Sequence, residues 1–231
     1  LYAMIRQYQP EAMIINNSGM QRPGESGHPE LDTVTFEQHA PKTLDRRDHS
    51  KYVAGEMCQT INRHWGIGSL DFQYKSVSDI IDFLCQCRKV GSNYLLNVGP
   101  DGEGAIPPLE EAMLRKIGDW MKIYANAIYA GRPDIIEATG EDFVLRNGKT
   151  LYYFAKNING HGHPDVSLNP GGNSPRSMFN ISEPIKYARW MDNGERLDVL
   201  QDLENNFAAI NCTGYPYGQN HVLRVAEITL I

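Results

Sequence analysis

The sequence predicts an α/β domain followed by an antiparallel β-sandwich. As far as Gly131, short apolar segments alternate with amphipathic segments of helical spacing, which is the pattern of a parallel sheet or barrel. From Pro133 onward the pattern changes to short strands separated by turn residues, and about a hundred residues is a common size for a sandwich. We therefore expect one domain over residues 1–131 and a second over residues 132–231.

The strands expected in the first domain are short and end in polar residues. They cover residues 12–17, 33–37, 52–55 and 94–98. Two helices are also expected, one before and one after the last of these strands. The first is capped by Ser76 or Ser78, since apolar residues recur at helical spacing from Val77 to Cys85. The second opens at Pro107-Pro108 and carries a long apolar stripe, formed by Met113, Ile117, Trp120, Met121, Tyr124 and Ile128.

In the second domain, turn residues predict hairpins. Asn147-Gly148 separates two apolar runs, and this pair suits a type I′ turn because both central residues need positive φ. Asp192-Asn193-Gly194 indicates a second hairpin, and residues 221–231 a final strand. Residues 157–177 are crowded with Gly, Pro, Asn and His, which predicts a long loop.

The composition limits the classes of partner. The chain has 231 residues, 41% of them hydrophobic, which is enough apolar material for a sizeable core. It carries 28 acidic and 22 basic residues, a net charge of −6, and no basic run, so we exclude nucleic acid and anionic membrane as partners. No stretch approaches the roughly 20 apolar residues that span a bilayer.

The start of the chain and its cysteines bear on its location. Residues 1–6 already resemble the middle of an amphipathic helix and lack an initial Met, so we expect a longer sequence upstream, which leaves a signal peptide open. Two of the four cysteines, Cys85 and Cys87, lie two apart on a predicted helix, where side chains do not face each other. We expect reduced, buried thiols, which favours the cytoplasm over secretion.

The candidate site follows from the ends of the parallel strands, where ligands of such sheets bind. Asn16 and Asn17 close the first strand, Glu37 closes the second, and Glu56 follows the start of the third. A glycosidase needs two carboxyl groups flanking the scissile bond. On pattern alone, Glu37 could equally be a surface glutamate and Glu56 a partner in a buried hydrogen-bond network.

Other chemistries fit less well. His161-Gly162-His163 lies in the Gly-rich loop, where a solvated loop is a simpler interpretation than a metal site. Residues 99–104 lack both the Lys-Ser/Thr of a P-loop and the ligand spacing of an EF-hand, so tight turns explain their glycines. We expect no metal and no cofactor.

Two long segments carry a family resemblance. Residues 55–66, Gly-Glu-Met-Cys-Gln-Thr-Ile-Asn-Arg-His-Trp-Gly, resemble the Trp-Glu-x-Cys-x-Thr-Ile-Asn-x-x-Trp-Gly-Tyr segment of α-L-fucosidases of glycoside hydrolase family 29. Lys75-Ser76 follows at the expected place. Residues 91–108 are similar to the family's Gly-Gly-Asn-Leu-Leu-Leu-Asn-Val-Gly-Pro-x-Gly-x-Gly-x-Ile-Pro signature. The ordered matches run from about Gln9 to Tyr129.

The resemblance implies the second half of a (β/α)8-like TIM barrel, followed by the β-sandwich. It also implies retaining exo-hydrolysis of terminal α-L-fucose from a fucosylated oligosaccharide or glycoconjugate. In this family the nucleophile is an Asp in a Trp-x-Asp segment upstream of the region that is Gln9-Pro10-Glu11 here. The only Trp-x-Asp of this chain is Trp190-Met191-Asp192, in a hairpin of the second domain. We therefore expect the nucleophile to lie upstream, on the N-terminal half of the barrel from the same or another chain.

The resemblance also suggests site residues. Residues 32–39 are similar to the family's Asp-x-x-Thr-x-Glu-Tyr, which implies Glu37 as the acid/base, and Glu56 matches the alternative candidate. Ser18 stands after Asn17 where the family usually has Arg, which leaves Arg22 as the nearest substitute beside the sugar. We expect Asn17, Arg22 and Trp65 to bind substrate, and Trp65 could stack on the sugar or fill the rim. Ile67 replaces the family's Tyr after Trp-Gly.

A second hypothesis comes from a different class. The chain could be a non-catalytic carbohydrate-binding fragment or a subunit of a split barrel. Half a barrel leaves two open sheet edges, which another chain would have to cover. A homo-oligomer is one way to cover them.

Overall fold

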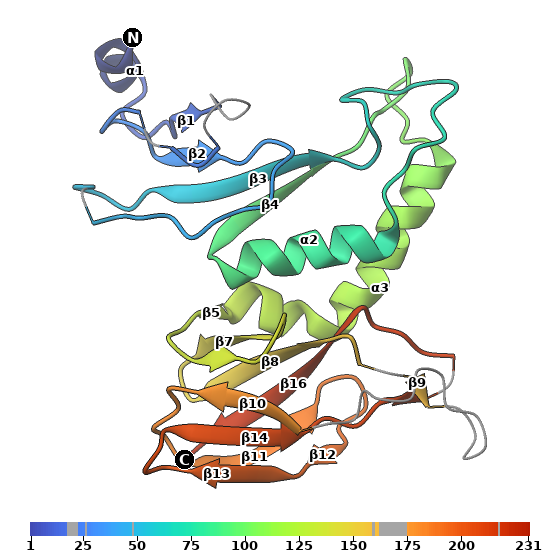
Figure 1. The fold of residues 1–231 in the computed structure, drawn as a ribbon. Helices are drawn as coiled ribbons and strands as arrows, with labels where there is room; N and C mark the ends of the chain where they lie inside the picture. The colour runs from blue at the N-terminus through green and yellow to red at the C-terminus, as the bar shows by residue number, and fades with distance from the viewer. Residues whose placement is uncertain (18–22, 26, 48, 159, 162–174, 217) are drawn as a thin grey trace. The chain divides into compact units, whose positions relative to one another are not determined.

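The computed structural model describes residues 1–17, 23–25, 27–47, 49–158, 160–161, 175–216 and 218–231 (Figure 1). The chain divides into two compact units, Leu1–Arg115 and Lys116–Ile231. This division falls inside helix α3 (Pro108–Ala130). The boundary expected between residues 131 and 132 stays a prediction about where the folding domains separate. None of the helices in the described residues combines the length and apolar character that crossing a bilayer requires.

The first unit is built on a four-stranded parallel sheet in the order β1-β2-β3-β4 (Figure 1). Its strands are β1 (Ile15–Asn16), β2 (Thr33–Thr35), β3 (Ala54–Thr60) and β4 (Ser92–Asn97). Helix α1 (Tyr2–Tyr8) precedes β1, and α2 (Val77–Lys89) connects β3 to β4. The strands and helices predicted in this region are present, but β1 and β2 are shorter than expected. β3 begins two residues later than expected and continues to Thr60, so Glu56 lies within the strand and not after it.

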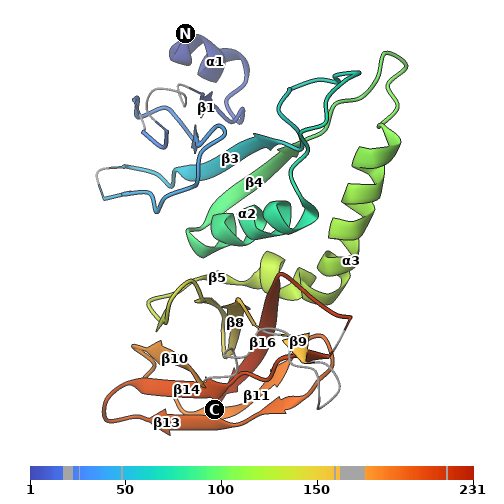
Figure 2. The ribbon, with the colours of Figure 1, turned by 45° about the vertical axis from the view of Figure 1, so that its right-hand side comes forward.

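Helix α2 covers one face of this sheet. Its N-terminus is fixed by a capping box, in which Ser76 accepts a hydrogen bond from the Asp79 backbone N–H and Asp79 accepts one from Ser76. Its buried side includes Cys87, which packs with Met57 of β3 and with Phe36. Figure 2 shows the helix lying along β3 and β4. Of the apolar stripe predicted from the sequence, Ile80, Ile81 and Cys85 are buried, whereas Cys87, which contacts the sheet, lies outside that stripe.

The opposite face of the sheet is polar. The strand register places Thr35 of β2 beside Glu56 of β3, and Glu56 beside Asn93 of β4. Because side chains alternate along a strand, these three point to the side away from Met57 and α2. The sheet therefore presents Met57 to the helix side, and Thr35, Glu56 and Asn93 to its other face.

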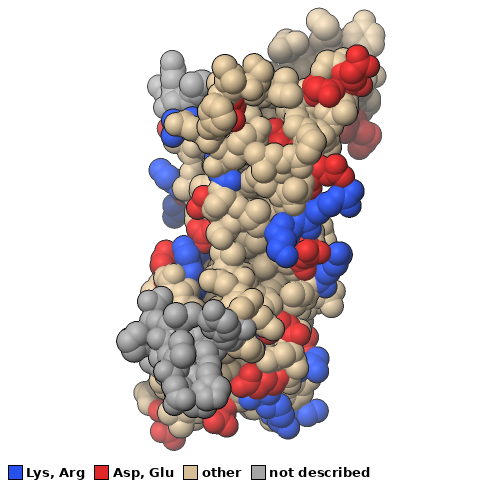
Figure 3. All heavy atoms as spheres, turned by 90° about the vertical axis from the view of Figure 1, so that its right-hand side faces the viewer, with Lys and Arg blue, Asp and Glu red and all other residues tan. Residues whose placement is uncertain are grey.

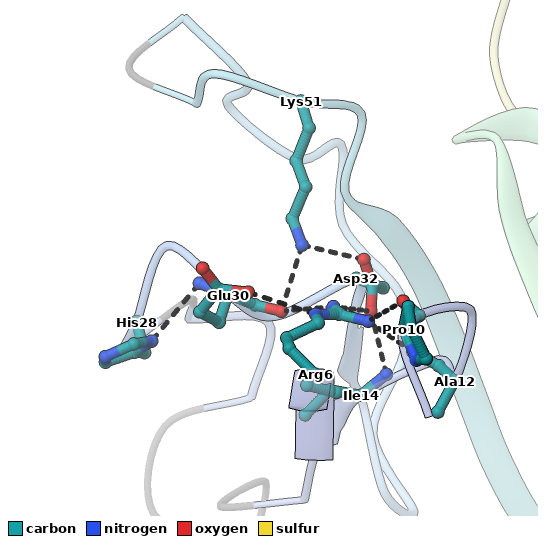
Figure 4. Close-up of polar contacts among 8 residues, drawn as sticks. All are labelled: Arg6, Pro10, Ala12, Ile14, His28, Glu30, Asp32 and Lys51. Carbon is teal, nitrogen blue, oxygen red and sulfur yellow. Dashed lines mark hydrogen bonds and ion pairs between the residues drawn. The ribbon is translucent and has the colours of Figure 1, made fainter. Parts of the chain in front are cut away.

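At the amino end of the sheet, Asp32 ties four segments together (Figure 4). Its carboxylate accepts hydrogen bonds from Lys51 at 2.7 Å and Arg6 at 2.9 Å, and from the Ile14 backbone N–H at 2.8 Å. Arg6 also pairs with Glu30 at 3.1 Å. The hydrogen bond from Lys51, then that from Ile14, holds the pKa of Asp32 well below its ordinary range. This cluster joins α1 and the start of β1 to β2.

We expect Asp32→Asn to loosen this end of the sheet. An uncharged amide cannot replace the charge-assisted bonds to Lys51 and Arg6, so backbone amides of β1 and β2 should exchange roughly tenfold faster at pH 7. Since the folded pKa of Asp32 is lowered from 3.8, the difference between wild type and variant should shrink as the pH falls below that value. Hydrogen exchange read by mass spectrometry measures both effects.

Asp45→Asn is the matched control, because Asp45 pairs with Arg47 on an exposed loop with 58% of its side chain accessible. It should leave exchange in β1 and β2 unchanged. A pH-independent effect of Asp32→Asn would contradict the role given to its charge.

The second unit contains two antiparallel sheets. The smaller has the order β13 (Val199–Asp202), β14 (Phe207–Asn211), β10 (Pro175–Phe179) and β6 (Glu137–Ala138). The larger has the order β12 (Arg196–Leu197), β11 (Ile185–Trp190), β16 (Leu223–Leu230), β8 (Thr150–Lys156), β7 (Phe143–Asn147) and β5 (Arg132–Pro133). Buried side chains of both sheets share one core, for example Met178 and Ile210 with Tyr153 and Ala226. The predicted antiparallel sandwich is confirmed.

The first hairpin differs from the prediction by one residue. Asn147 pairs with Thr150, so the two-residue turn is Gly148-Lys149 and not Asn147-Gly148. Only Gly148 of these has positive φ, at 57°, as the first central position of a type II′ turn requires. The expected type I′ turn is therefore wrong, because extending β7 through Asn147 lets glycine alone satisfy the turn. The second hairpin, β11 with β12, is confirmed.

The loop predicted over residues 157–177 contains strand residues near both of its ends, so its predicted bounds are wrong. Gly160–His161 forms β9, which pairs in parallel with β15 (Tyr215–Pro216). Pro175 already pairs with Asn211, so β10 begins inside the segment predicted as a loop. Both strands form because they pair with segments far along the chain, which a local sequence pattern does not reveal. Gly162 and His163 lie outside the described residues.

A buried ion pair sits at the edge of the sandwich core. Arg224 is fully buried, and its Nε and Nη2 each donate to the Asp192 carboxylate at 2.9 Å. Its Nη1 donates to the carbonyls of Thr213 at 3.1 Å and Gly214 at 3.0 Å, and its guanidinium lies 4.3 Å from the ring centre of Trp190. Asp192 of the Trp-x-Asp triplet is therefore engaged in holding Arg224.

Charged side chains on α3 have partners of opposite sign. Glu111 pairs with Arg115, and Asp119 pairs with Lys116 and Lys122. Figure 3 shows the two signs mixed on the face that it draws. Such a mixture gives no continuous basic track for a phosphate backbone on this face.

All four cysteines lie in described segments, and all are buried free thiols, as expected. Burial raises the pKa of the Cys87 and Cys212 thiols to about 12. Thiols that resist ionisation are inert structural residues. Whether the protein resides in the cytoplasm stays a prediction.

Candidate active site

Glu37 lies at the carboxyl edge of the sheet, two residues after the end of β2. Its half-buried carboxylate accepts a hydrogen bond at 2.8 Å from the side-chain amide of Asn17, which follows β1. The next residue, Gln38, has a φ of 56° in the left-handed region and turns the chain away from the sheet. The rule that strand ends meet at one edge thus correctly brought Asn17 and Glu37 together.

A cavity of about 740 Å³ opens beside Glu37. Its walls include Glu37, His39, Arg63, Trp65, Tyr74 and Lys75. Trp65 has 49% of its surface exposed, so its ring is available to a ligand. The volume and the mixture of one carboxylate, one indole ring and several hydrogen-bonding groups suit a small polar ligand such as a sugar.

Lys75 shapes the wall of this cavity. Its ammonium donates to the Asn62 carbonyl at 3.0 Å and also to the Thr60 carbonyl, which ties down the chain just after β3. Burial lowers the pKa of Lys75, and nearby Arg63 adds to this effect. Lys75 therefore acts on the loop backbone and keeps the segment before Trp65 in place.

Glu56 occupies a different position from Glu37. It lies within β3, where its carboxylate accepts a hydrogen bond at 2.7 Å from the side-chain amide of Asn93, and it is not among the residues that line the cavity. Both glutamates lie near Cys58, whose thiol pKa is raised by burial first and then by the charges of Glu37 and Glu56. The two carboxylates thus share a face of the sheet, and only Glu37 reaches the cavity wall.

The sequence missed several wall residues. His39, Tyr74 and Lys75 come from loops whose spacing carries no periodic signal. Of these residues, Lys75 was noted in the sequence as part of the family resemblance, but no role in the site was assigned to it. Arg22 lies outside the described residues, so its part in sugar binding stays a prediction. Among the described residues, no group of three or more His, Cys, Asp and Glu gathers as metal ligands would.

The loop that carries Trp65 depends on a close backbone approach at Gly99. The Asn97 side-chain amide donates to the Trp65 carbonyl at 3.0 Å, and the Gly99 N–H donates to the buried Glu110 carboxylate at 2.9 Å. A Cβ at residue 99 would lie 2.6 Å from the carbonyl carbon of Gly66. Only glycine fits there without moving the Trp65 loop.

We therefore expect Gly99→Ala to destabilise the first unit by about 1–3 kcal/mol, the usual effect of overpacking. Gly102→Ala in the same loop is the matched control, because a Cβ there meets nothing within 4 Å. Scanning calorimetry of the two variants measures the difference. Equal melting temperatures would show that the Trp65 loop tolerates the extra methyl group.

Comparison with known proteins decides the family. A sequence model described as "Alpha-L-fucosidase" matches residues 1–126, which include the sheet, α2 and the cavity. This chain belongs to the alpha-L-fucosidase family. Within the family, it is 33% identical over 105 residues to the tissue alpha-L-fucosidase of Rattus norvegicus, covering 44% of this chain and 21% of that protein. It is 40% identical over 82 residues to the tissue alpha-L-fucosidase of Homo sapiens, covering 34% of this chain and 17% of that protein.

Solved structures of this family extend the likeness to the sandwich. Alpha-L-fucosidase isoenzyme 1 from Paenibacillus thiaminolyticus aligns with 100% of this chain at a TM-score of 0.74 and 25% identity. The Thermotoga maritima alpha-fucosidase, solved in complex with a mechanism-based inhibitor, aligns with 98% at a TM-score of 0.65 and 20% identity, which supports the fold alone. The chain covers 52% and 47% of those two structures, or about half of each.

Proposed function

We propose that this chain is the C-terminal part of a retaining alpha-L-fucosidase that releases terminal α-L-fucose from fucosylated oligosaccharides or glycoconjugates. The observation that carries the proposal is the place of Glu37, on the wall of a cavity of about 740 Å³ at the carboxyl edge of a parallel sheet. Membership of the alpha-L-fucosidase family indicates the reaction in which this carboxylate would take part.

The sheet is proposed to be the second half of a (β/α)8-like barrel. Its four strands follow one another in chain order, α2 covers one face, and polar side chains occupy the other, as in the wall of a barrel whose inner face is lined by functional groups. The alignment to about half of the solved fucosidases supports this. Strands of the N-terminal half, from the same or another chain, would then pair with β1 and β4.

The proposed reaction is a double displacement. An upstream Asp attacks the anomeric carbon and forms a glycosyl-enzyme, while Glu37 gives a proton to the leaving oxygen. Glu37 then takes a proton from water, which attacks the anomeric carbon and frees fucose with retained configuration. Retention requires the two carboxyl groups to lie roughly 5–5.5 Å apart. Asn17 and Trp65 are the proposed sugar contacts, with Arg22 as a further candidate.

Glu37 is proposed as the acid/base in preference to Glu56. Proton transfer needs a carboxyl group within hydrogen-bond reach of the substrate. Glu37 lines the cavity, whereas Glu56 is held by Asn93 within β3. Glu56 would instead help to order the polar face of the sheet.

The test uses the full-length polypeptide that contains this chain. We expect it to release fucose from an aryl α-L-fucoside, and NMR during the first turnovers should show the α-anomer before mutarotation. Formation of the β-anomer first would overturn the retaining mechanism. Binding of fucosylated oligosaccharide in calorimetry without any release would instead favour a carbohydrate-binding fragment or a subunit of a split barrel.

A further inference from the structure

The hydrogen bonds around Glu37 extend one residue further than the proposed site. Thr35 is buried in β2, with 4% of its surface exposed, and its hydroxyl donates at 2.9 Å to the side-chain oxygen of Asn17. The nitrogen of the same amide donates at 2.8 Å to Oε2 of Glu37. We propose that Thr35 is a positioning residue that acts through Asn17 to orient the Glu37 carboxyl group for proton transfer. This inference rests on the proposed function.

The orientation of the Asn17 amide is the critical point. Its oxygen and nitrogen ends have nearly the same shape, so an exposed asparagine at a strand end could present either end to Glu37. An ionised carboxylate only accepts hydrogen bonds, so the amide oxygen facing it would place two acceptors in contact. The Thr35 hydroxyl, by donating to the amide oxygen, holds the nitrogen toward Glu37.

This orientation distinguishes the two oxygens of Glu37. Oε2 accepts from the amide nitrogen, so this oxygen is engaged in that hydrogen bond and Oε1 is the one left to face the cavity. The proton that moves to the leaving group is therefore carried on Oε1. Fixing one oxygen also restricts rotation of the carboxyl group, and precise placement of the proton donor is a large part of general acid catalysis.

The burial of Thr35 makes it a better orienting group than a surface residue would be. Its backbone is fixed in the sheet by pairing with Glu56, and its β-branched side chain has few rotamers. Asn17 and Glu37 both lie at strand ends, where the backbone is less constrained. Thr35, held in β2, thus fixes the positions of Asn17 and Glu37 beside the cavity.

The experiment compares Thr35→Val, Thr35→Ser and Thr33→Val in the full-length polypeptide. Thr33 is the matched control, because it lies on the same strand and face and is equally buried at 3% exposure. With a fucoside of poor leaving group, Thr35→Val should lower kcat about ten- to a hundredfold, because the Asn17 amide is then free to turn and its hydrogen bond to the charged Glu37 carboxylate is lost. With an activated aryl fucoside, whose departure needs little proton donation, the loss should be much smaller.

Thr35→Ser should restore most of the lost turnover, because it returns the hydroxyl, and Thr33→Val should leave both substrates near wild type. Equal losses of Thr35→Val on both substrates, or no rescue by serine, would overturn the positioning role.

A neutron crystal structure of Thr35→Val, which distinguishes the nitrogen of the Asn17 amide from its oxygen, provides a readout that does not require activity. Separation of the Asn17 amide nitrogen from Glu37 Oε2 is the expected result, and an unchanged distance would overturn the inference. If the wild-type polypeptide released no fucose, the proposed function would fail by itself, and this structure would still decide whether Thr35 orients Asn17.

Discussion

Glu37→Gln in the full-length polypeptide should lower turnover of a fucoside with a poor leaving group by about 10²–10⁴-fold, the usual contribution of a general acid. The amide keeps the size of the side chain and can still meet Asn17, but it has no proton to give. On an activated aryl fucoside, the first step needs little acid assistance, so the loss should be far smaller. Steady-state kinetics on the two substrates measure the contrast.

Glu56→Gln is the matched control. It makes the same change on the same face of the sheet, one strand away, at a carboxylate that Asn93 holds and the cavity does not reach. Its effect should be the smaller one on both substrates. A larger leaving-group-dependent loss in Glu56→Gln would transfer the acid/base role to Glu56.

Asp192→Asn should destabilise the sandwich by about 3–5 kcal/mol. It leaves the buried guanidinium of Arg224 with only the carboxylate of Glu195, which is 41% exposed and lies 4.0 Å away, as a counter-charge. Arg224 has no exposed side-chain surface and Asp192 only 5%, so water cannot replace the lost partner. The carbonyls of Thr213 and Gly214 still accept from Arg224, but they carry no charge. Urea unfolding of wild type and variant gives the difference.

Asp119→Asn serves as the control for this change, since it removes a carboxylate that is 53% exposed on α3 of the same unit. Its unfolding midpoint should stay close to wild type. The Asp192 variant should also keep wild-type turnover per folded molecule. Loss of turnover in folded Asp192→Asn would place the nucleophile on this chain and refute its expected position upstream.

The layout of the first unit could be predicted because its signals are local. The polar residues that end short apolar runs marked the carboxyl edge of the sheet, and Asn17 and Glu37 were among them. The apolar spacing after Ser76 likewise marked α2. The link from Thr35 through Asn17 was not predicted, because a threonine within a strand has no pattern that separates a hydrogen-bonding role from β propensity.

The second unit was harder to predict in detail. The hairpin turn at Gly148 differed from the expectation because the pairing of Asn147 with Thr150 depends on the whole β7–β8 ladder. Arg224 lies in the predicted final strand, and nothing in the sequence pattern marks it as buried. Its burial arises only when β16 lies beside β11, which brings Asp192 next to it from elsewhere in the sequence.

The two unlike faces of the parallel sheet also protect the chain during folding. A slip of β3 by one residue against its neighbours would turn Glu56 toward α2 and Met57 toward the polar side. A carboxylate would then be desolvated without a partner, and a thioether would displace groups that hydrogen-bond one another. Such a one-residue slip is thus penalised on both faces at once, so the strands that carry the acid/base candidates discriminate strongly against pairings offset by an odd number of residues.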